Sequence, residues 1–149
     1  MRAVVQRVKR AKVEVNSEIT GEIDSGLLVF LGIGKEDGRQ DADYLLEKII
    51  NLRIFEDEEE KLNLSAADLN KDIMLVSQFT LFGDCRQGRR PSFFEAAPPA
   101  EAEKLYNYFV KEAEKSSLKI ETGEFQAMMD VSLINDGPVT ILVDSKKKF

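Results

Sequence analysis

The apolar stretches of this sequence are short, which favours β-strands over long helices. The longest uninterrupted stretch, Leu27 to Leu31, follows Gly26 and is typical of a strand that is buried on both faces. Before it, apolar and polar residues alternate from Ala11 to Asn16, which together with Val4 and Val8 predicts a long, half-buried strand that bends near Lys9. Residues 18–23 predict a return strand, so the chain is expected to open with a hairpin.

Two segments have the periodicity of amphipathic helices. The first is expected to begin at Asp41, as its N-cap, and to end near Arg53, with Leu45, Ile49 and Leu52 on its buried side. The second is expected to begin after Pro98-Pro99. Its apolar residues recur on one stripe: Leu105, Tyr106, Phe109, Val110 and Ala113.

Strands dominate the rest of the sequence. They are predicted over residues 73–82, 118–125 and 127–134, and a last strand is predicted from Val139, after a turn over residues 135–138. Two connections are expected, a solvated acidic loop over residues 57–60 and a long, functional one over residues 83–99. This order of elements indicates an α+β fold with mostly antiparallel sheets, in one domain over residues 1–149.

Two residue counts exclude most catalytic chemistry. The chain has no histidine, which removes Ser-His-Asp triads, Cys-His nucleophiles and any imidazole base. It has one cysteine, Cys85, which removes disulfides within the chain, CxxC redox pairs and thiolate zinc sites. We therefore expect no metal and no cofactor. Catalysis has to use hydroxyls, carboxylates, lysines, backbone amides or groups of the substrate.

The formal net charge of −6 argues against general coating of nucleic acid. No apolar run approaches the roughly 20 residues of a membrane span, and the first residues lack signal-peptide character, so a cytoplasmic protein is expected. Basic residues nevertheless gather within residues 2–12, 86–90 and 146–148. They predict either a local phosphate-binding surface or ordinary solvated side chains, and both interpretations remain open.

Two segments carry polar groups that suit a reaction site. Ser77-Gln78-Phe79-Thr80 lies in an otherwise apolar stretch. Its polar groups are satisfied locally, lie on an exposed face of the sheet, or lie at a strand end, where hydroxyls and backbone N–H groups can hold an oxyanion. In Asn135-Asp136-Gly137-Pro138, the Gly-Pro bond is either an ordinary turn or a cis bond whose carbonyl groups suit a cationic amine.

The same two segments carry a family resemblance. They extend to Ser77–Leu81 and Asn135–Thr140, with supporting matches at residues 1–8, 51–57 and 88–93. Over essentially its whole length the chain closely resembles the D-aminoacyl-tRNA deacylases, also called D-tyrosyl-tRNA deacylases. It departs from them at Gln126, where glycine is expected in many relatives. The resemblance implies a barrel-like, mostly antiparallel sheet with two main helices, and a homodimer with active sites at its interface.

The resemblance also implies an activity. The expected reaction is hydrolysis of the ester that joins a D-amino acid to the terminal adenosine of a tRNA. Mischarged glycyl-tRNA is a further expected substrate, and L-aminoacyl-tRNAs are rejected. Catalysis is assigned to Ser77, Gln78, Phe79 and Thr80. Substrate binding and chiral selection are assigned to Gly137 and Pro138, joined by a cis bond and inserted into the partner's pocket, and to Met129 and Arg7.

Two mechanisms remain open from the sequence. In one, Thr80 Oγ attacks the ester and an acyl-enzyme forms. In the other, the 2′-hydroxyl of the RNA activates a water, and this is favoured because no imidazole is available to activate the threonine. Two other functions also remain open: an inactive RNA-binding dimer and a general D-amino-acid esterase.

Overall fold

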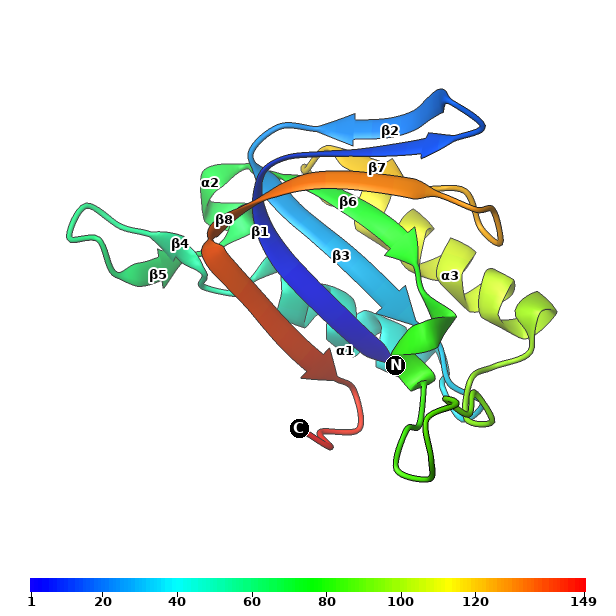
Figure 1. The fold of residues 1–149 in the computed structure, drawn as a ribbon. Coiled ribbons are helices and arrows are strands. Elements are labelled where there is room, and N and C mark those ends of the chain that lie inside the picture. Colours follow the sequence, from blue (N-terminus) through cyan, green and yellow to red (C-terminus); the bar gives the residue numbers. More distant parts are fainter.

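A computed structural model describes residues 1–149. Its centre is a six-stranded sheet. The path of paired strands runs β2–β1–β3–β6–β7, and β8 also pairs with β1. The sheet curls into a nearly closed, barrel-like shape (Figure 1). The strands have these bounds: β1 (Arg2–Val15), β2 (Glu18–Ile23), β3 (Gly26–Gly32), β6 (Asp72–Ser77), β7 (Ile120–Thr122) and β8 (Asp130–Asp144).

Strand β1 organises the sheet because it pairs along both edges. On one edge its first half pairs with β3 and its second half with β2, while β8 follows the other edge; all three pairings are antiparallel. The β3–β6 and β6–β7 pairings are parallel. The register with β8 is irregular on both sides of Val8, beside the bend expected at Lys9. The α+β class with a mostly antiparallel sheet is confirmed.

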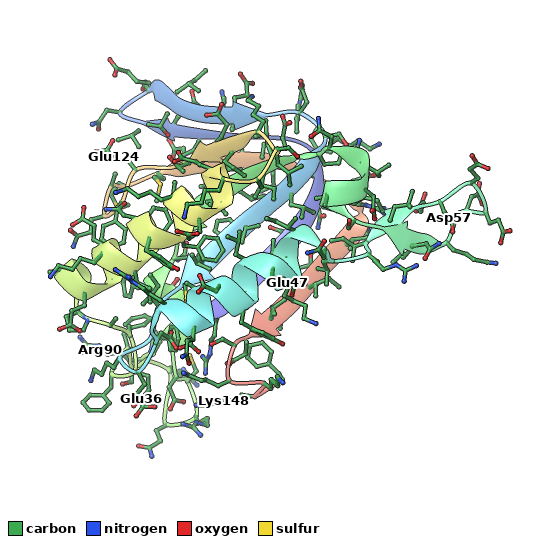
Figure 2. All side chains as sticks on the ribbon, turned by 180° about the vertical axis from the view of Figure 1, so that it is seen from behind. Glu36, Glu47, Asp57, Arg90, Glu124 and Lys148 are labelled. Atoms are coloured by element: carbon green, nitrogen blue, oxygen red, sulfur yellow. The ribbon has the colours of Figure 1, made fainter.

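Two helices, α1 (Arg39–Ile50) and α3 (Pro99–Glu114), cover one face of the sheet (Figure 2). Leu45 and Ile49 of α1 and Phe109 of α3 are fully buried, in one cluster with Leu27 of β3. Full burial of such a side chain is worth about 1.5–3 kcal/mol, so this layer stabilises the sheet. The second helix begins at Pro99, as expected.

The first helix begins earlier than expected. It starts at Arg39 with Gly38 as N-cap, and the carboxylate of Asp41 accepts a hydrogen bond from the Gly38 N–H at 2.9 Å. The assignment of Asp41 as N-cap is therefore wrong. Asp41 is instead the third residue of the helix, and its carboxylate accepts the backbone hydrogen bond of the N-cap residue. The helix ends at Ile50, capped by Asn51, rather than near Arg53.

Three strand predictions are wrong in extent. The strand predicted over residues 73–82 ends at Ser77, and Phe79–Phe82 form a 3-10 turn, η1. The chain crosses close over Gly32 here, where a Cβ atom would lie 3.1 Å from Gln78 O. The strand predicted over residues 118–125 is reduced to β7. The one predicted over residues 127–134 begins only at Asp130.

Residues 135–138 do not form the predicted turn, and β8 runs through them. Asn135 pairs with Val8 and Thr140 pairs with Gln6, so four residues of β8 lie opposite the single residue Arg7. We refer to these four residues, 136–139, as the Gly-Pro bulge. A bulge inserts residues without ending the strand, so a Gly-Pro pair alone is not sufficient evidence for a chain reversal.

Residues 55–69 contain three short elements that the sequence did not predict. They are the hairpin strands β4 (Phe55–Glu56) and β5 (Leu62–Leu64) and the helix α2 (Ala66–Leu69). Elements this short offer no periodicity to detect. Residues 58–60, at the hairpin tip, are exposed as expected for the acidic loop. None of the helices combines the length and the apolar character that a membrane span requires.

Candidate active site

A cavity of about 860 Å³, here called the main cavity, opens at the carboxyl ends of β3 and β6. The end of the long connection, the start of α3 and residues 125–129 complete its wall. Fourteen of its twenty lining residues are hydrophobic. This size and lining are typical of a site for a small organic group rather than for an ion.

Aromatic side chains in the wall remain exposed. Phe79, at the start of η1, is 59% exposed and meets Phe93 edge to face, with ring centroids 5.0 Å apart. Phe94 is 72% exposed, and Lys35 Nζ lies 3.4 Å from the centre of its ring. Exposed aromatic rings around a cavity indicate a ligand or partner surface, and they suit the stacking of a planar base.

Backbone hydrogen bonds hold the long connection that carries Phe93 and Phe94. The Ala97 N–H donates to Ile33 O at 2.9 Å, and the Lys35 N–H donates to Glu95 O at 3.1 Å. The connection is thereby fixed against the chain that leaves β3. This placement supports the expectation that the long connection is functional.

The polar part of the wall comes from the end of β6. Ser77, Gln78 and Phe79 line the main cavity, and the side-chain amide of Gln78 donates a hydrogen bond to Oγ1 of the exposed Thr80. The Thr80 hydroxyl therefore meets a hydrogen-bond donor and no base, so it gains no help toward deprotonation. Lys35 is the one charged residue in the wall.

The backbone N–H groups at the start of η1 also lie at this edge. Gln78 precedes η1 but makes no side-chain cap to it. The first N–H groups of a helical turn have no acceptor within that turn. Donors of this kind can stabilise a developing oxyanion. The structure has features of both interpretations of residues 77–80: they lie at a strand end, and the side chains of Gln78 and Thr80 also satisfy each other.

The remaining predicted site residues divide between two places. Met129 lines the main cavity, whereas Arg7, Gly137 and Pro138 do not. Across the sheet Arg7 lies level with Ile73, four residues before Ser77. At about 3.3 Å per residue this is roughly 13 Å along the strand. Within one chain the structure does not bring the Gly-Pro bulge to the main cavity.

The Gly-Pro bulge is exposed on its outer side and braced on its inner side. Gly137 and Pro138 are exposed and are joined by a cis peptide bond. The guanidinium of Arg7, which is 6% exposed, donates to Asp136 O at 3.2 Å and to Ile54 O at 2.8 Å. It also lies 3.6 Å from the Asp136 carboxylate. Arg7 thus fixes the bulge relative to the sheet.

Asn135, next to the bulge, has an unsatisfied side-chain atom. Its Nδ2 donates to Thr140 Oγ1 at 3.2 Å, but its buried Oδ1 has no hydrogen-bond partner. Most buried acceptors in proteins have a donor. Because this oxygen is inaccessible to solvent, a donor from outside the chain does not reach it, and the unpaired acceptor is a local energetic cost beside the bulge.

Gln126 lines the main cavity in the left-handed backbone conformation, with φ of 63°. Glycine adopts this conformation without steric cost, which is the physical reason why glycine suits the position. The glutamine is exposed and lies outside both motifs. Its departure from the expected glycine therefore changes the lining of the main cavity as well as the local backbone strain.

Some residues of the basic clusters pair with carboxylates of the protein itself. Arg2 pairs with Asp144 at 3.2 Å, and Arg86 pairs with Asp84 at 2.7 Å. These contacts favour a structural role over a phosphate-binding surface for these side chains. Other basic residues of the clusters are exposed and form no ion pair: Lys9, Arg10, Arg89, Arg90, Lys147 and Lys148. No three acidic or cysteine side chains come together as metal ligands would.

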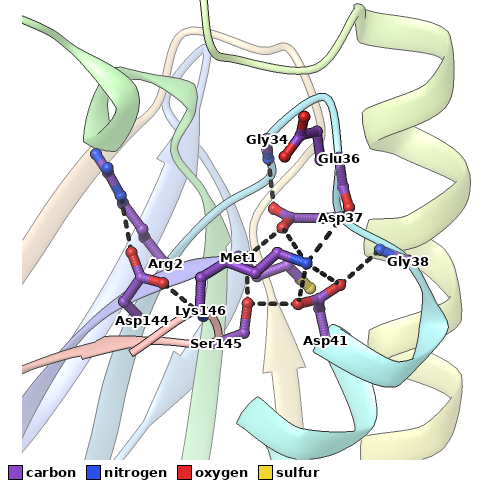
Figure 3. A network of polar contacts seen from close by, with 10 residues as sticks. All are labelled: Met1, Arg2, Gly34, Glu36, Asp37, Gly38, Asp41, Asp144, Ser145 and Lys146. Atoms are coloured by element: carbon purple, nitrogen blue, oxygen red, sulfur yellow. Dashed lines mark hydrogen bonds and ion pairs between the residues drawn. The ribbon is translucent and has the colours of Figure 1, made fainter. Parts of the chain in front are cut away.

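A polar network fixes the loop that follows β3 (Figure 3). The Met1 amino group lies 2.6 Å from the carboxylate of Asp37 and donates to Ser145 Oγ at 2.6 Å. Ser145 Oγ in turn donates to Asp41 at 2.7 Å, and Asp37 accepts the Gly34 N–H at 2.6 Å. The network joins residues near both chain ends to the loop that carries Lys35.

The network also governs the ionisation of Asp41. Burial disfavours the charged carboxylate. Hydrogen bonds from Lys146, the Gly38 N–H and Ser145, with the charge of the Met1 amino group, outweigh this and lower the pKa of Asp41 to about 2. Asp41 is therefore ionised in the folded protein near neutral pH.

Lys35 is a residue of the site that the sequence motifs do not indicate. No motif or spacing distinguishes it from other surface lysines. Its position just after a buried strand was the one available indication, because ligand sites gather at the carboxyl ends of parallel strands.

Comparison with known proteins finds one family model and relatives that carry one name. The family model described as D-Tyr-tRNA(Tyr) deacylase matches residues 4–144. Proteins named D-aminoacyl-tRNA deacylase from Thermosipho africanus and Halothermothrix orenii are 62% and 64% identical over 149 residues, covering 100% of both chains in each case.

Solved structures agree with this fold. The c-Myc DNA unwinding element binding protein is 43% identical, with a TM-score of 0.91 over 97% of this chain and 98% of the other. A probable eukaryotic D-amino acid tRNA deacylase is 16% identical, with a TM-score of 0.77 over 95% of this chain and 97% of the other. The second likeness concerns the fold alone.

Proposed function

This chain belongs to the D-Tyr-tRNA(Tyr) deacylase family, and we propose on that basis that residues 1–149 act as one D-aminoacyl-tRNA deacylase domain. The reaction is hydrolysis of the ester between a D-amino acid and the terminal adenosine of a tRNA, which releases both. The observation that carries this proposal is the main cavity. Exposed aromatic rings meet amide and hydroxyl groups there, and Lys35 is its one charged residue.

The main cavity suits an aminoacyl-adenosine. Its volume of about 860 Å³ lies within the roughly 300–1,000 Å³ of small-molecule sites. The rings of Phe79, Phe93 and Phe94 offer stacking surfaces to the base, worth about 1–3 kcal/mol per base. Stacking on the terminal adenosine is independent of the tRNA body, as an enzyme that edits many tRNAs requires.

Hydrolysis needs little catalytic assistance from the protein because an aminoacyl ester is already activated. Backbone N–H groups at Phe79 and Thr80 hold the oxyanion, and Ser77 and Gln78 position the ester; loss of one oxyanion donor typically costs about 10²–10³ in rate. The 2′-hydroxyl of the terminal adenosine activates the attacking water. In support, the Thr80 hydroxyl accepts a hydrogen bond from Gln78, and no carboxylate lines the main cavity.

Chiral selection comes from the Gly-Pro bulge of a second copy of this chain. The bulge is exposed and lies roughly 13 Å along the strand from its own cavity, so it acts on the partner's cavity in a two-fold dimer. Its carbonyl groups take the α-amino group and leave no room for an L side chain. Glycine has no side chain to exclude, so mischarged glycyl-tRNA is a substrate too.

A further observation supports a partner on this face. The exposed apolar side chains of Ile134 and Leu142 flank the Gly-Pro bulge on β8, at 42% and 58% exposure. Exposed apolar side chains of this size on one strand suit contact with another protein.

The test is deacylation of D-Tyr-tRNA and L-Tyr-tRNA in parallel, at catalytic protein concentration. Rapid loss of the D-ester with the L-ester intact is the expected result. Loss of neither ester would favour an inactive RNA-binding dimer, and loss of both would remove the Gly-Pro bulge as the chiral filter. Hydrolysis of D-Tyr methyl ester at a comparable rate would favour a general D-amino-acid esterase. Glycyl-tRNA in the same assay tests the achiral substrate.

A further inference from the structure

A second, smaller cavity of about 280 Å³ adjoins the main cavity. The two share Ile33, Lys35 and Ala97 in their walls. The remaining wall comes from the start of α1, including Arg39, and from the first turns of α3, including Lys104. A group that leaves the main cavity past Lys35 therefore enters this second cavity.

The second cavity is basic, in a protein whose formal net charge is −6. Lys35, Arg39 and Lys104 line it, all three are exposed, and none forms an ion pair. Two carboxylates, Asp37 and Glu101, also line it. Asp37 is neutralised by the Met1 amino group at 2.6 Å, which leaves one free carboxylate against three free cations.

Aromatic rings hold two of these cations in place. The Lys35 ammonium lies 3.4 Å from the ring centre of Phe94, and the Arg39 guanidinium lies 5.0 Å from that of Tyr108. Such contacts orient a cation without neutralising it, so its charge stays available to an anion. The network around Asp37 fixes the loop between the two cations (Figure 3).

We propose that the second cavity binds the phosphodiester backbone that leads to the terminal adenosine of the tRNA. This inference rests on the proposed function, because it places the adenosine in the main cavity. The 5′-phosphate of that adenosine then passes Lys35, and the preceding backbone meets Arg39 and Lys104. The site recognises phosphate charge and no base, so it serves every tRNA alike.

The test compares two doubly substituted proteins of equal charge. In the first, Arg39→Gln and Lys104→Gln remove two cations of the second cavity. In the control, Lys48→Gln and Lys111→Gln remove two exposed cations of the same helices outside its wall. Each protein is assayed on D-Tyr-tRNA and on 3′-O-D-tyrosyl-adenosine, which has no phosphate, across a series of salt concentrations.

We expect the cavity variant to raise KM for D-Tyr-tRNA about 10-fold, with kcat unchanged. The salt dependence of log(kcat/KM) should fall by about 0.7 for each phosphate that the variant no longer neutralises. Its hydrolysis of D-tyrosyl-adenosine should match that of the unsubstituted protein. The control should match the unsubstituted protein on both substrates. Lys104→Glu alone should raise KM for D-Tyr-tRNA further than Lys104→Gln.

Three results would overturn the inference while leaving the proposed function intact. The first is an unchanged KM for D-Tyr-tRNA in the cavity variant. The second is an equal rise in the control, which would indicate a general charge effect. The third is a rise in KM for D-tyrosyl-adenosine equal to that for tRNA, because that substrate has no phosphate. If the unsubstituted protein hydrolyses neither substrate, the proposed function fails and this inference fails with it.

Discussion

At the residue scale, Gly137 combines a backbone conformation that disfavours side chains with close neighbouring atoms. Its φ of 122° lies in a region that side chains rarely adopt, and a Cβ atom would lie 2.8 Å from Val139 Cγ2 and 3.1 Å from Arg7 Nη2. Gly137→Ala is therefore expected to displace the bulge and reduce D-Tyr-tRNA deacylation about 100-fold or more, since a displacement of about 1 Å can cost this much.

The control for this substitution is Ser132→Ala, at an exposed position of β8 that lies outside the Gly-Pro bulge and outside both cavities. It should leave the rate near that of the unsubstituted protein. Single-turnover rates on D-Tyr-tRNA compare the two. A native rate in Gly137→Ala would show that the bulge does not act at the reaction site.

Thr80 tests the mechanism. Its hydroxyl accepts a hydrogen bond from Gln78 and has no base to activate it, so Thr80→Ala is expected to retain deacylation within about 10-fold. A substrate with a 2′-deoxyadenosine terminus should instead lose about 100-fold or more, because the activating hydroxyl is gone. Detection of an acyl-Thr80 ester by mass spectrometry of a quenched single turnover would contradict this mechanism.

Gln126 tests the departure from the expected glycine. Its φ of 63° costs a side-chain-bearing residue about 1–2 kcal/mol, and glycine loses about 0.5–1 kcal/mol in extra unfolded-state entropy. Gln126→Gly should therefore stabilise the protein by about 0.5–1 kcal/mol, seen as a rise of a few degrees in Tm by calorimetry. A fall in Tm would mean that the glutamine side chain makes a compensating contact.

At the element scale, the sequence predicts best where burial alone decides the structure. Strand β3 is continuous apolar sequence after a glycine, and α3 begins at a proline and buries a single stripe, so both are found as expected. Phe79–Phe82 have strand-like residues but form η1, because the crossing over Gly32 is a tertiary contact that no local pattern contains. The bulge in β8 escapes prediction for the same reason.

The candidate site divides in a similar way. The motif residues at 77–80 and 135–140 could be named from the sequence, because their residue types are unusual for their surroundings. Two features could not: Lys35 in the cavity wall, and the distance between the main cavity and the Gly-Pro bulge. The first depends on how residues 95–97 pair with the chain after β3, and the second depends on the register of β1 with β3 and β8. A single sequence specifies neither.

Helix α1 depends on Asp41, and this dependence is sensitive to pH. The folded-state pKa of about 2 lies below the usual value of about 3.9, so the ionised carboxylate stabilises the fold above about pH 4. This contribution is lost as the pH falls toward 2. Asp41→Asn should therefore lower the unfolding free energy by about 1–2 kcal/mol at pH 6, and by much less near pH 2.

Urea unfolding of both proteins between pH 2 and pH 6 measures this difference. The surface ion pair between Glu112 and Lys115 at the end of α3 offers a control. Because surface pairs contribute little, Glu112→Gln should change stability little at any pH. A difference between Asp41→Asn and the unsubstituted protein that stays constant down to pH 2 would exclude Asp41 as the titrating group.

At the scale of the whole molecule, each reaction site needs two subunits in the proposed dimer, one for the main cavity and one for the Gly-Pro bulge. This division predicts complementation between two inactive variants. Gly137→Ala damages only the bulge, and Ala127→Trp, in the loop that lines the main cavity, obstructs only the cavity. A mixed dimer then has one intact site, formed by the Gly137→Ala cavity and the Ala127→Trp bulge.

Co-expression with two different tags gives the mixed dimer directly. Random assembly makes half of the dimers mixed, each with one of its two sites intact, so the whole population should recover about a quarter of the unsubstituted activity. Tandem purification of the mixed dimer should raise this to about half. If each chain instead completes its own site, neither preparation recovers activity, and the bulge would have to reach its own cavity by a rearrangement of β8.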